Sequence, residues 1–445
     1  MQNGLVTENS KPKTISLLEK IIVGIIFIFP MMGAFTPFDV YMSPSAEDLN
    51  INQTLYLPPT SFATSSMIHI ATWGLLLALS LLNWRGMLRQ AQFMLPLLAL
   101  IGWIFASALW SVDPNNTLHR AFHMMDHVVF ATYLVQRYSW REMISLFTHS
   151  FLFIFILSVV MALGFPDLGL SSLAGYNDAW RGAFTEKNFL GAVAVMGMLI
   201  SGYSLVHGIN NRWYAAFIYL GQMFLIVMSR SATSAVTLMI VFSLIVLALG
   251  VSVHQQPVTR FFSLAALLVG AISVMLLFGA YDSIHEMTGR SADMTGRTEI
   301  WHYVLKTIQA RPWFGYGYGF WSAPSLPKLN VWQALGRPLP HAHNEWLDAT
   351  LQLGLWGLCV QVYCLMLAMT RAVRLSFVMR DGKALFCGLL LITLCVRGYA
   401  ETVLTDPVIN GWFWLVISYL MLAHMAKERA SAPPIEASEL QQIAG

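Results

Sequence analysis

Stretches of mostly apolar residues recur along nearly the whole chain, and short polar segments separate them. A membrane-spanning helix needs ~20 consecutive, predominantly apolar residues. The pattern therefore predicts an all-α polytopic membrane protein with about 12 transmembrane helices. We place these helices near residues 20–36, 64–83, 93–111, 121–136, 147–165, 189–206, 214–229, 232–251, 261–281, 346–370, 384–403 and 410–425.

A long polar island, residues 282–342, interrupts the apolar pattern late in the chain. Within it, apolar residues at Ile300, Tyr303, Val304 and Ile308 are spaced for one face of a helix. Pro312 follows this stretch and cannot continue a helix. We therefore expect the loop to contain short helices of its own.

The placement of Lys and Arg predicts that both termini lie in the cytoplasm, because cytoplasmic loops carry an excess of positive charge. This orientation places the long loop in the periplasm. The loop has no counterpart in the first half of the chain, which argues against a transporter built from two repeats. The expected segments are 1–19 (cytoplasmic), 20–281 (the first nine helices), 282–342 (long periplasmic loop), 343–425 (the last three helices) and 426–445 (a cytoplasmic, disordered tail).

Composition narrows the class of protein further. The chain is 56% hydrophobic and 11% charged, whereas a soluble domain carries about 25% charged residues. The net charge is only +3 and no Lys/Arg run is present, so nucleic acid is not an expected partner. The 4 cysteines fall in predicted membrane helices without a CxxC spacing and are interpreted as apolar filler.

Several basic residues oppose the charge bias because they lie in predicted outer segments, which suggests that they bind an anionic group. Arg230 has no acid nearby in sequence, so a phosphate is its expected partner. Arg397 lies four residues before Glu401, and either an anionic ligand or an ion pair with Glu401 would explain it. The remaining candidates are Arg181, Lys187, Arg297 and Arg311, of which Arg181 and Lys187 could instead be ordinary flanking cations.

Two histidines, His341 and His343, precede the tenth predicted helix. A neutral imidazole is the usual general base for a hydroxyl near pH 7. A metal site would need a third ligand, and none of matching type is adjacent in sequence, so no metal is expected. A helix-capping histidine is the structural alternative, and Glu345 and Asp348 are further candidate bases.

Glycines alternate with aromatic residues between Arg311 and Trp321, in a run that includes Tyr316 and Tyr318. Such a run would present aromatic faces for stacking against a sugar or an isoprenoid chain. The alternative is a loop that packs its aromatic side chains at the membrane interface.

Taken in order, these segments resemble the O-antigen ligase/polymerase superfamily. The resemblance covers most of the chain and rests on Ser107–Pro114, Arg181–Asn188, Ser229–Ser231, Gly296–Trp301, Arg311–Trp321 and His341–Leu347. It implies a GT-C-like fold in the bacterial inner membrane. It also implies periplasmic transfer of a glycan from undecaprenyl diphosphate without a metal or another cofactor. By position, the family's two essential arginines correspond to Arg230 and Arg297, and its essential histidine corresponds to His343.

The residue sequences of two segments, Trp180–Asn188 and Arg311–Trp321, look most like those of exopolysaccharide polymerases of the ExoQ or Wzy kind. This similarity favours a polymerase over a ligase acting on lipid A-core. Arg181, Lys187, His341, Glu345, Arg311, Tyr316 and Tyr318 are the expected substrate-binding residues. The expected partners are the lipid-linked donor, a glycan or lipid-linked acceptor and membrane lipid. Chain-length regulators and export proteins are further candidates. A lipid-linked glycan flippase, or a structural or regulatory subunit, remains as an alternative class.

Overall fold

The computed structural model describes residues 15–31, 62–171, 178–252, 295–323, 325–405 and 411–431. Regular structure in these ranges is helical, and the pairing of Leu170 with Trp180 is an isolated bridge. The predicted all-α class is thereby confirmed. The described residues form two compact units, 1–87 with 133–235 and 88–132 with 236–445, and each is described by itself.

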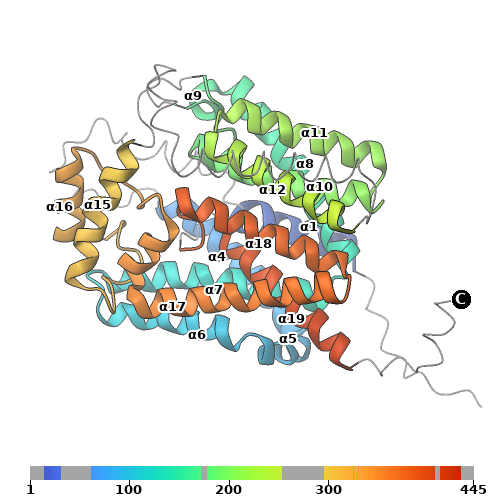
Figure 1. Ribbon diagram of the computed structural model, residues 1–445, viewed down its shortest axis with the longest axis horizontal. Helices are drawn as coiled ribbons and strands as arrows, with labels where there is room; N and C mark the ends of the chain where they lie inside the picture. The colour runs from blue at the N-terminus through green and yellow to red at the C-terminus, as the bar shows by residue number, and fades with distance from the viewer. Residues whose placement is uncertain are drawn as a thin grey trace, which may run out of the picture. The chain divides into compact units, whose positions relative to one another are not determined.

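In the first unit, helix α10 packs against α11 and α8, and α8 also contacts α1 and α9 (Figure 1). Gln222 of α11 donates a hydrogen bond to the Phe151 carbonyl of α8, at 2.9 Å, so the contact between these helices includes a buried polar link. The helices of this unit are α1 (Leu17–Ile26), η1 (Phe27–Met31), α4 (Phe62–Leu82), α8 (Trp140–Gly164), α9 (Pro166–Gly169), α10 (Lys187–Val206) and α11 (Arg212–Ser229).

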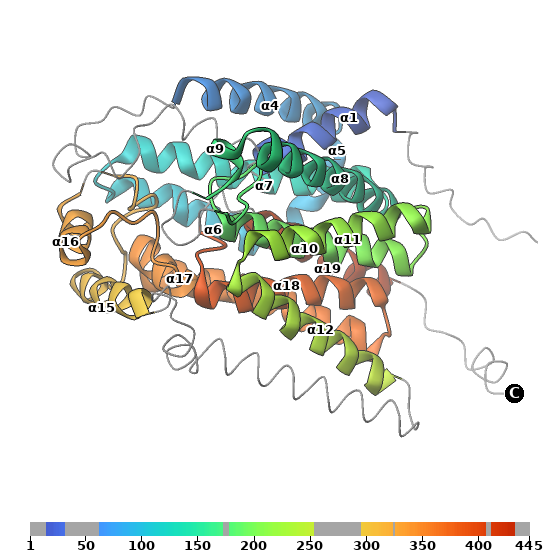
Figure 2. The same ribbon diagram turned by 90° about the horizontal axis from the view of Figure 1, so that it is seen from above.

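In the second unit, α17 contacts α18, α19, α6 and α15, so it is the central helix (Figure 2). The helices within this unit are η2 (Ala91–Phe93), α6 (Leu95–Ala106), η3 (Ser107–Leu109), α15 (Thr295–Ala310), α16 (Leu326–Leu335), α17 (Glu345–Val373), η4 (Arg374–Val378), α18 (Gly382–Ala400) and α19 (Gly411–Ser431). Three more helices continue from one unit into the other: α5 (Trp84–Gln90), α7 (Pro114–Arg137) and α12 (Ala232–Ser252).

Several helices are long and apolar enough to cross a membrane. By length and composition there are 4 among the described residues: Trp140–Gly164, Lys187–Val206, Glu345–Val378 and Gly382–Ala400. A fifth is possible if Trp84–Phe93 and Leu95–Leu109, which are bent by 92°, form one span. These helices support a membrane protein. They do not establish the count of about twelve, and the span expected at 261–281 lies outside the described residues.

The seventh and eighth expected spans are nearly continuous in sequence, yet the structure separates them cleanly. Helix α11 ends at Ser229, and Arg230 adopts a left-handed conformation with φ 48°. The next residue, Ser231, accepts a hydrogen bond from the Ser234 N–H at 3.4 Å and so caps the start of α12. The break therefore places Arg230 at a strained corner between two helices.

The polar island contains the helix that its apolar spacing predicts, since α15 covers the expected face and ends two residues before Pro312. Helix α16 is a second short helix in this loop, whose bounds were not predicted from the sequence. Its start is set by Ser325, whose hydroxyl accepts the Lys328 N–H, and its end by Gly336, with φ 68°. Ile300, Val304 and Ile308 of α15 are buried in one apolar cluster with Val331 of α16.

The Gly/aromatic run lies along a break in α17. Gly354 has φ 70° within that helix, and a side chain there would collide with the Trp313 carbonyl. Freed carbonyl groups of Leu351 and Gln352 accept the N–H groups of Tyr316 and Gly317, at 3.0 and 2.9 Å. The run therefore joins the polar island firmly to the central helix.

Candidate functional site

Local sequence places His343 immediately outside the start of α17. Asn344 caps this helix by accepting the Leu347 N–H at 3.1 Å. His343 has φ 51°. A left-handed backbone is uncommon for a residue other than glycine, and such residues cluster at functional sites. Among the described residues only Arg230, His343 and Arg380 share this feature.

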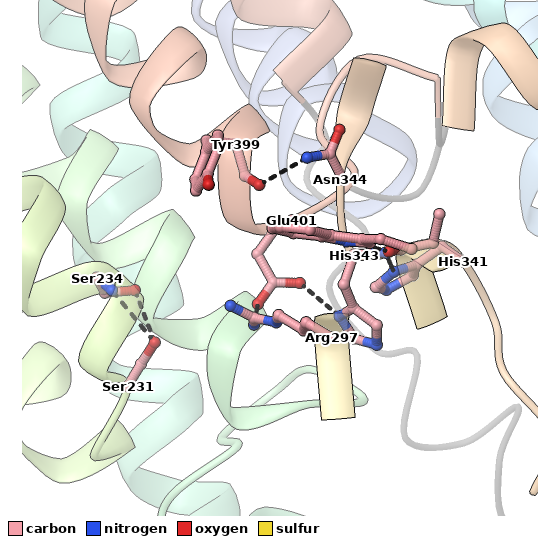
Figure 3. Close-up of polar contacts among 10 residues, drawn as sticks. Ser231, Ser234, Arg297, His341, His343, Asn344, Tyr399 and Glu401 are labelled. Carbon is pink, nitrogen blue, oxygen red and sulfur yellow. Dashed lines mark hydrogen bonds and ion pairs between the residues drawn. The ribbon is translucent and has the colours of Figure 1, made fainter. Parts of the chain in front are cut away.

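Glu401, the residue after the end of α18, joins the two catalytic candidates of this unit (Figure 3). One carboxylate oxygen, Oε1, accepts a hydrogen bond from Nη2 of Arg297 at 2.8 Å. The other, Oε2, lies 3.0 Å from Nδ1 of His343. The exposed fractions of the Arg297, Glu401 and His343 side chains are 9%, 6% and 20%, so the histidine is the most accessible.

The charge of Glu401 is stabilised by its partners. Burial alone would raise the pKa of this carboxyl, but the Arg297 guanidinium and the His343 hydrogen bond outweigh burial and hold the pKa well below its usual range. An ionised carboxylate only accepts hydrogen bonds. We therefore assign the shared proton to Nδ1 of His343, which leaves Nε2 with the lone pair that a general base requires.

His341 supports the unusual backbone of its neighbour. Nδ1 of His341 accepts the His343 N–H at 3.2 Å, and the two rings pack edge to face with centroids 4.1 Å apart. His341 itself is buried, with 5% exposure. This placement suits a supporting role better than the direct substrate contact expected from sequence.

The structure also supplies the third potential metal ligand that the local sequence lacked. Ligand atoms of His341, His343 and Glu401 lie within 4.8 Å of one another. However, the Arg297 guanidinium is hydrogen-bonded to the same carboxylate, and Nδ1 of His341 is engaged by a backbone N–H. A fixed positive charge and an occupied lone pair both disfavour a bound cation here.

Arg230 belongs to the first unit, where the structure gives it an acidic partner. Its guanidinium pairs with both carboxylate oxygens of Asp178, at 2.7 and 2.5 Å. An acidic partner therefore exists, 52 residues away in sequence. The two side chains are 49% and 65% exposed. Arg230 and Arg297, which correspond by position to the family's two essential arginines, lie in different units.

Arg181 and Lys187 also lie in the first unit. The Arg181 guanidinium donates hydrogen bonds to the carbonyl oxygens of Leu168, Asp167 and Thr185, at 3.0, 2.9 and 3.5 Å. Burial lowers the pKa of Arg181. Lys187 is the first residue of α10 and is buried. Arg181 thus holds its own loop together, and the substrate contacts expected of both residues stay predictions.

Glu345 and Asp348 occupy the first turn of α17 and have no exposed surface. Glu345 accepts hydrogen bonds from Gln361 and from the backbone of 403–405. Asp348 accepts from Trp321 and Thr402. Both carboxylates are therefore committed to protein donors, which does not suit the role of base or substrate contact that the sequence suggested.

The aromatic run is buried in its tyrosine-containing part, whereas Trp313 and Phe314 at its start are exposed. Tyr316 and Tyr318 are 7% and 0% exposed, and Thr117 donates a hydrogen bond to the Tyr318 carbonyl at 2.6 Å. The guanidinium of Arg311, an exposed residue, lies 5.2 Å from the centre of the Tyr316 ring. The expectation of open stacking faces at the two tyrosines is therefore wrong, because positive-φ glycines turn this backbone into the protein.

Glu401 is a candidate functional residue whose contacts were not predicted from the sequence. It was considered only as the i,i+4 partner of Arg397, whereas its carboxylate reaches residues 104 and 58 positions away. Arg397 is itself buried. The signal available in sequence was an acid at the outer end of an apolar helix, where an ionisable residue is a functional candidate.

Comparisons with known proteins indicate a family for the chain. Residues 214–362 match the family described as O-antigen ligase. The chain is also 24% identical over 372 residues to the exopolysaccharide production protein ExoQ of Rhizobium meliloti, an alignment that covers 81% of this chain and 84% of that protein.

The matched family segment begins in α11 and ends in α17, so it contains Arg230, Arg297 and His343. The two matches confirm the resemblance inferred from the motifs. The chain is similar to the O-antigen ligase/polymerase superfamily over most of its length.

Proposed function

We propose that this protein polymerises exopolysaccharide or O-antigen repeat units by transferring a glycan from an undecaprenyl-diphosphate carrier to a sugar hydroxyl. The observation that carries the proposal is Glu401, which links a buried arginine to an accessible histidine at 2.8 and 3.0 Å. That grouping holds a base beside a fixed positive charge, as displacement of an anionic leaving group requires.

In the proposed reaction, Nε2 of His343 takes the proton of the acceptor hydroxyl as its oxygen attacks the anomeric carbon. The new carbon–oxygen bond forms as the bond to the diphosphate breaks, and the carrier leaves as undecaprenyl diphosphate. The imidazolium that results is stabilised by Glu401 through Nδ1. Direct displacement of this kind inverts the anomeric centre and needs no covalent intermediate.

Arg297 and Arg230 neutralise the developing charge of the diphosphate in this proposal. The Arg230–Asp178 pair is half exposed, and exposed ion pairs contribute only about 0–1 kcal/mol. A diphosphate can therefore replace Asp178 at little cost. Asp178 would hold the guanidinium in place until the donor arrives.

A deletion strain analysed for its glycans tests the function. Loss of a polymerase leaves single repeat units, transferred or free. Long chains that remain on the lipid carrier would instead indicate a lost ligase acting on lipid A-core. Donor that never reaches the periplasm would indicate a flippase, the alternative of another class.

We propose that the site faces the periplasm of the bacterial inner membrane. Gln333 is exposed on α16, within the polar island. A cysteine placed there should react with a membrane-impermeant maleimide in cells whose outer membrane alone has been permeabilised. Because the native cysteines are Cys359, Cys364, Cys387 and Cys395, the assay uses a variant in which these four are replaced. Labelling that requires rupture of the inner membrane would contradict this orientation.

We further propose that the reaction is independent of metal. Arg297 already supplies the positive charge at Glu401 that a divalent cation would otherwise provide. Treatment of purified protein with EDTA should leave its polymerising rate unchanged. A loss of rate that added Zn²⁺ or Mn²⁺ restores would show that His341, His343 and Glu401 form a metal centre instead.

A further inference from the structure

Side chains at the start of α17 form hydrogen bonds with the chain on both sides of Glu401. Asn344 donates a hydrogen bond from Nδ2 to the Tyr399 carbonyl at 3.0 Å, two residues before Glu401 (Figure 3). Asp348 accepts the Thr402 hydroxyl at 2.6 Å, one residue after it. Three side chains at the start of one helix thus hold this segment, and Glu345 is the third.

Glu345 binds the following residues through their backbone. Its Oε2 accepts the N–H groups of Val403 and Leu404, each at 2.7 Å, and that of Thr405 at 3.3 Å. Its Oε1 accepts Nε2 of Gln361 at 2.6 Å. Segment 403–405 follows the end of α18, so these N–H groups need a partner outside the helix, and Glu345 provides it.

The contact between the first turn of α17 and residues 401–405 is buried and closely packed. Residues 401–405 are each no more than 5% exposed. A side chain added at Gly398 would lie 3.2 Å from Cβ of Glu345, so α18 approaches α17 closely here. Asp348 also accepts Nε1 of Trp321 at 2.5 Å, which ties the same turn to the Gly/aromatic run.

We propose that Glu345 and Asp348 are positioning residues, which fix the 401–405 segment and so set Glu401 against His343 and Arg297. The proposal rests on the function proposed above. It explains why a histidine, an asparagine and two acids occur together in one motif. The histidine performs the chemistry, and the other three side chains hold the carboxylate that orients it.

Asp348→Asn and Thr402→Val test this role. Asparagine keeps only one acceptor oxygen for the two donors Trp321 and Thr402, so it disturbs the bond to Thr402, and Thr402→Val removes the donor of that bond. A displacement of about 1 Å at a reacting group can lower a rate by about 100-fold. We expect kcat to fall by about 10- to 100-fold in both variants, while KM for the lipid-linked donor changes less than about threefold. The assay uses the full chain with an undecaprenyl-diphosphate-linked repeat unit isolated from a polymerase-deficient strain.

Gln352→Met is the matched control. Gln352 is a buried polar residue of the same helix, and its Oε1 accepts the Gly319 N–H at 2.8 Å. Its loss should lower the melting temperature at least as much as Asp348→Asn but leave kcat nearly unchanged. Equal kcat losses in the control and in the two test variants would mean that Asp348 only stabilises the fold.

Coupling to Glu401 gives a second measurement. In a Glu401→Gln background, Asp348→Asn should change kcat less than about twofold, since the group it positions is already impaired. If the effects of Asp348→Asn and Glu401→Gln on kcat are independent and multiply, the positioning role is overturned, and the proposed reaction is left intact. A Glu401→Gln protein with the full wild-type rate would contradict the proposed site itself. If that variant is too slow to measure, the comparison with Gln352→Met decides.

Discussion

His343→Ala is expected to lower the rate of polymer formation by about 10²- to 10⁴-fold, the range of general-base catalysis. The acceptor hydroxyl is far less acidic than an imidazolium, so its proton must leave during bond formation. Nδ1 of His343 is held by Glu401, and Nε2 is the nitrogen available for that proton. Binding of the lipid-linked donor should be retained, because the histidine acts on the acceptor.

His343→Asn separates this chemistry from backbone strain. Asparagine tolerates the left-handed conformation that His343 adopts, and its amide can still donate to Glu401, yet it has no basic nitrogen. We expect the asparagine variant to be as slow as the alanine variant. An asparagine variant within tenfold of the wild-type rate would identify His343 as a conformational residue rather than a base.

Elements whose signals are local could be predicted from sequence. Apolar runs located helices such as α10 and α12, whose observed starts lie within two residues of the expected ones. The face formed by Ile300, Val304 and Ile308 predicted α15 in the same way. The motif order also indicated the superfamily, because it depends on residue identity along the chain and not on contacts.

Contacts between distant segments could not be predicted. Asp178 and Arg230 are 52 residues apart, and nothing in either neighbourhood indicates that they pair. Glu401 has a nearby basic residue in sequence, Arg397, which made a local ion pair the simplest interpretation. Arg297 of α15 and His343 at the start of α17 are also its partners in the structure, and only the tertiary fold brings them to it.

The Gly/aromatic run was recognised from the sequence, but the burial of Tyr316 and Tyr318 was not. Alternating glycine and tyrosine is compatible with open stacking faces and equally with a backbone that packs tightly. The choice depends on whether another segment offers hydrogen-bond partners, and the break in α17 at Gly354 frees carbonyl groups that do so. That break depends on close approach to Trp313, which sequence alone does not reveal.

Arg297→Lys is expected to lower kcat by about 10²- to 10³-fold, comparable with removal of one preorganised donor from a charge-stabilising site. A guanidinium can contact Glu401 and a phosphate oxygen at the same time through separate N–H groups, whereas an ammonium is a compact point charge. The charge balance of the buried pair is kept, so the variant should fold. The lost interaction belongs to the departing diphosphate, and kcat should therefore fall more than KM rises. Arg337→Lys, an exposed arginine of the same polar island, is the matched control and should retain the wild-type rate. A fully active Arg297→Lys protein at normal abundance would show that a positive charge beside Glu401 is sufficient, and would remove Arg297 from direct contact with the leaving group.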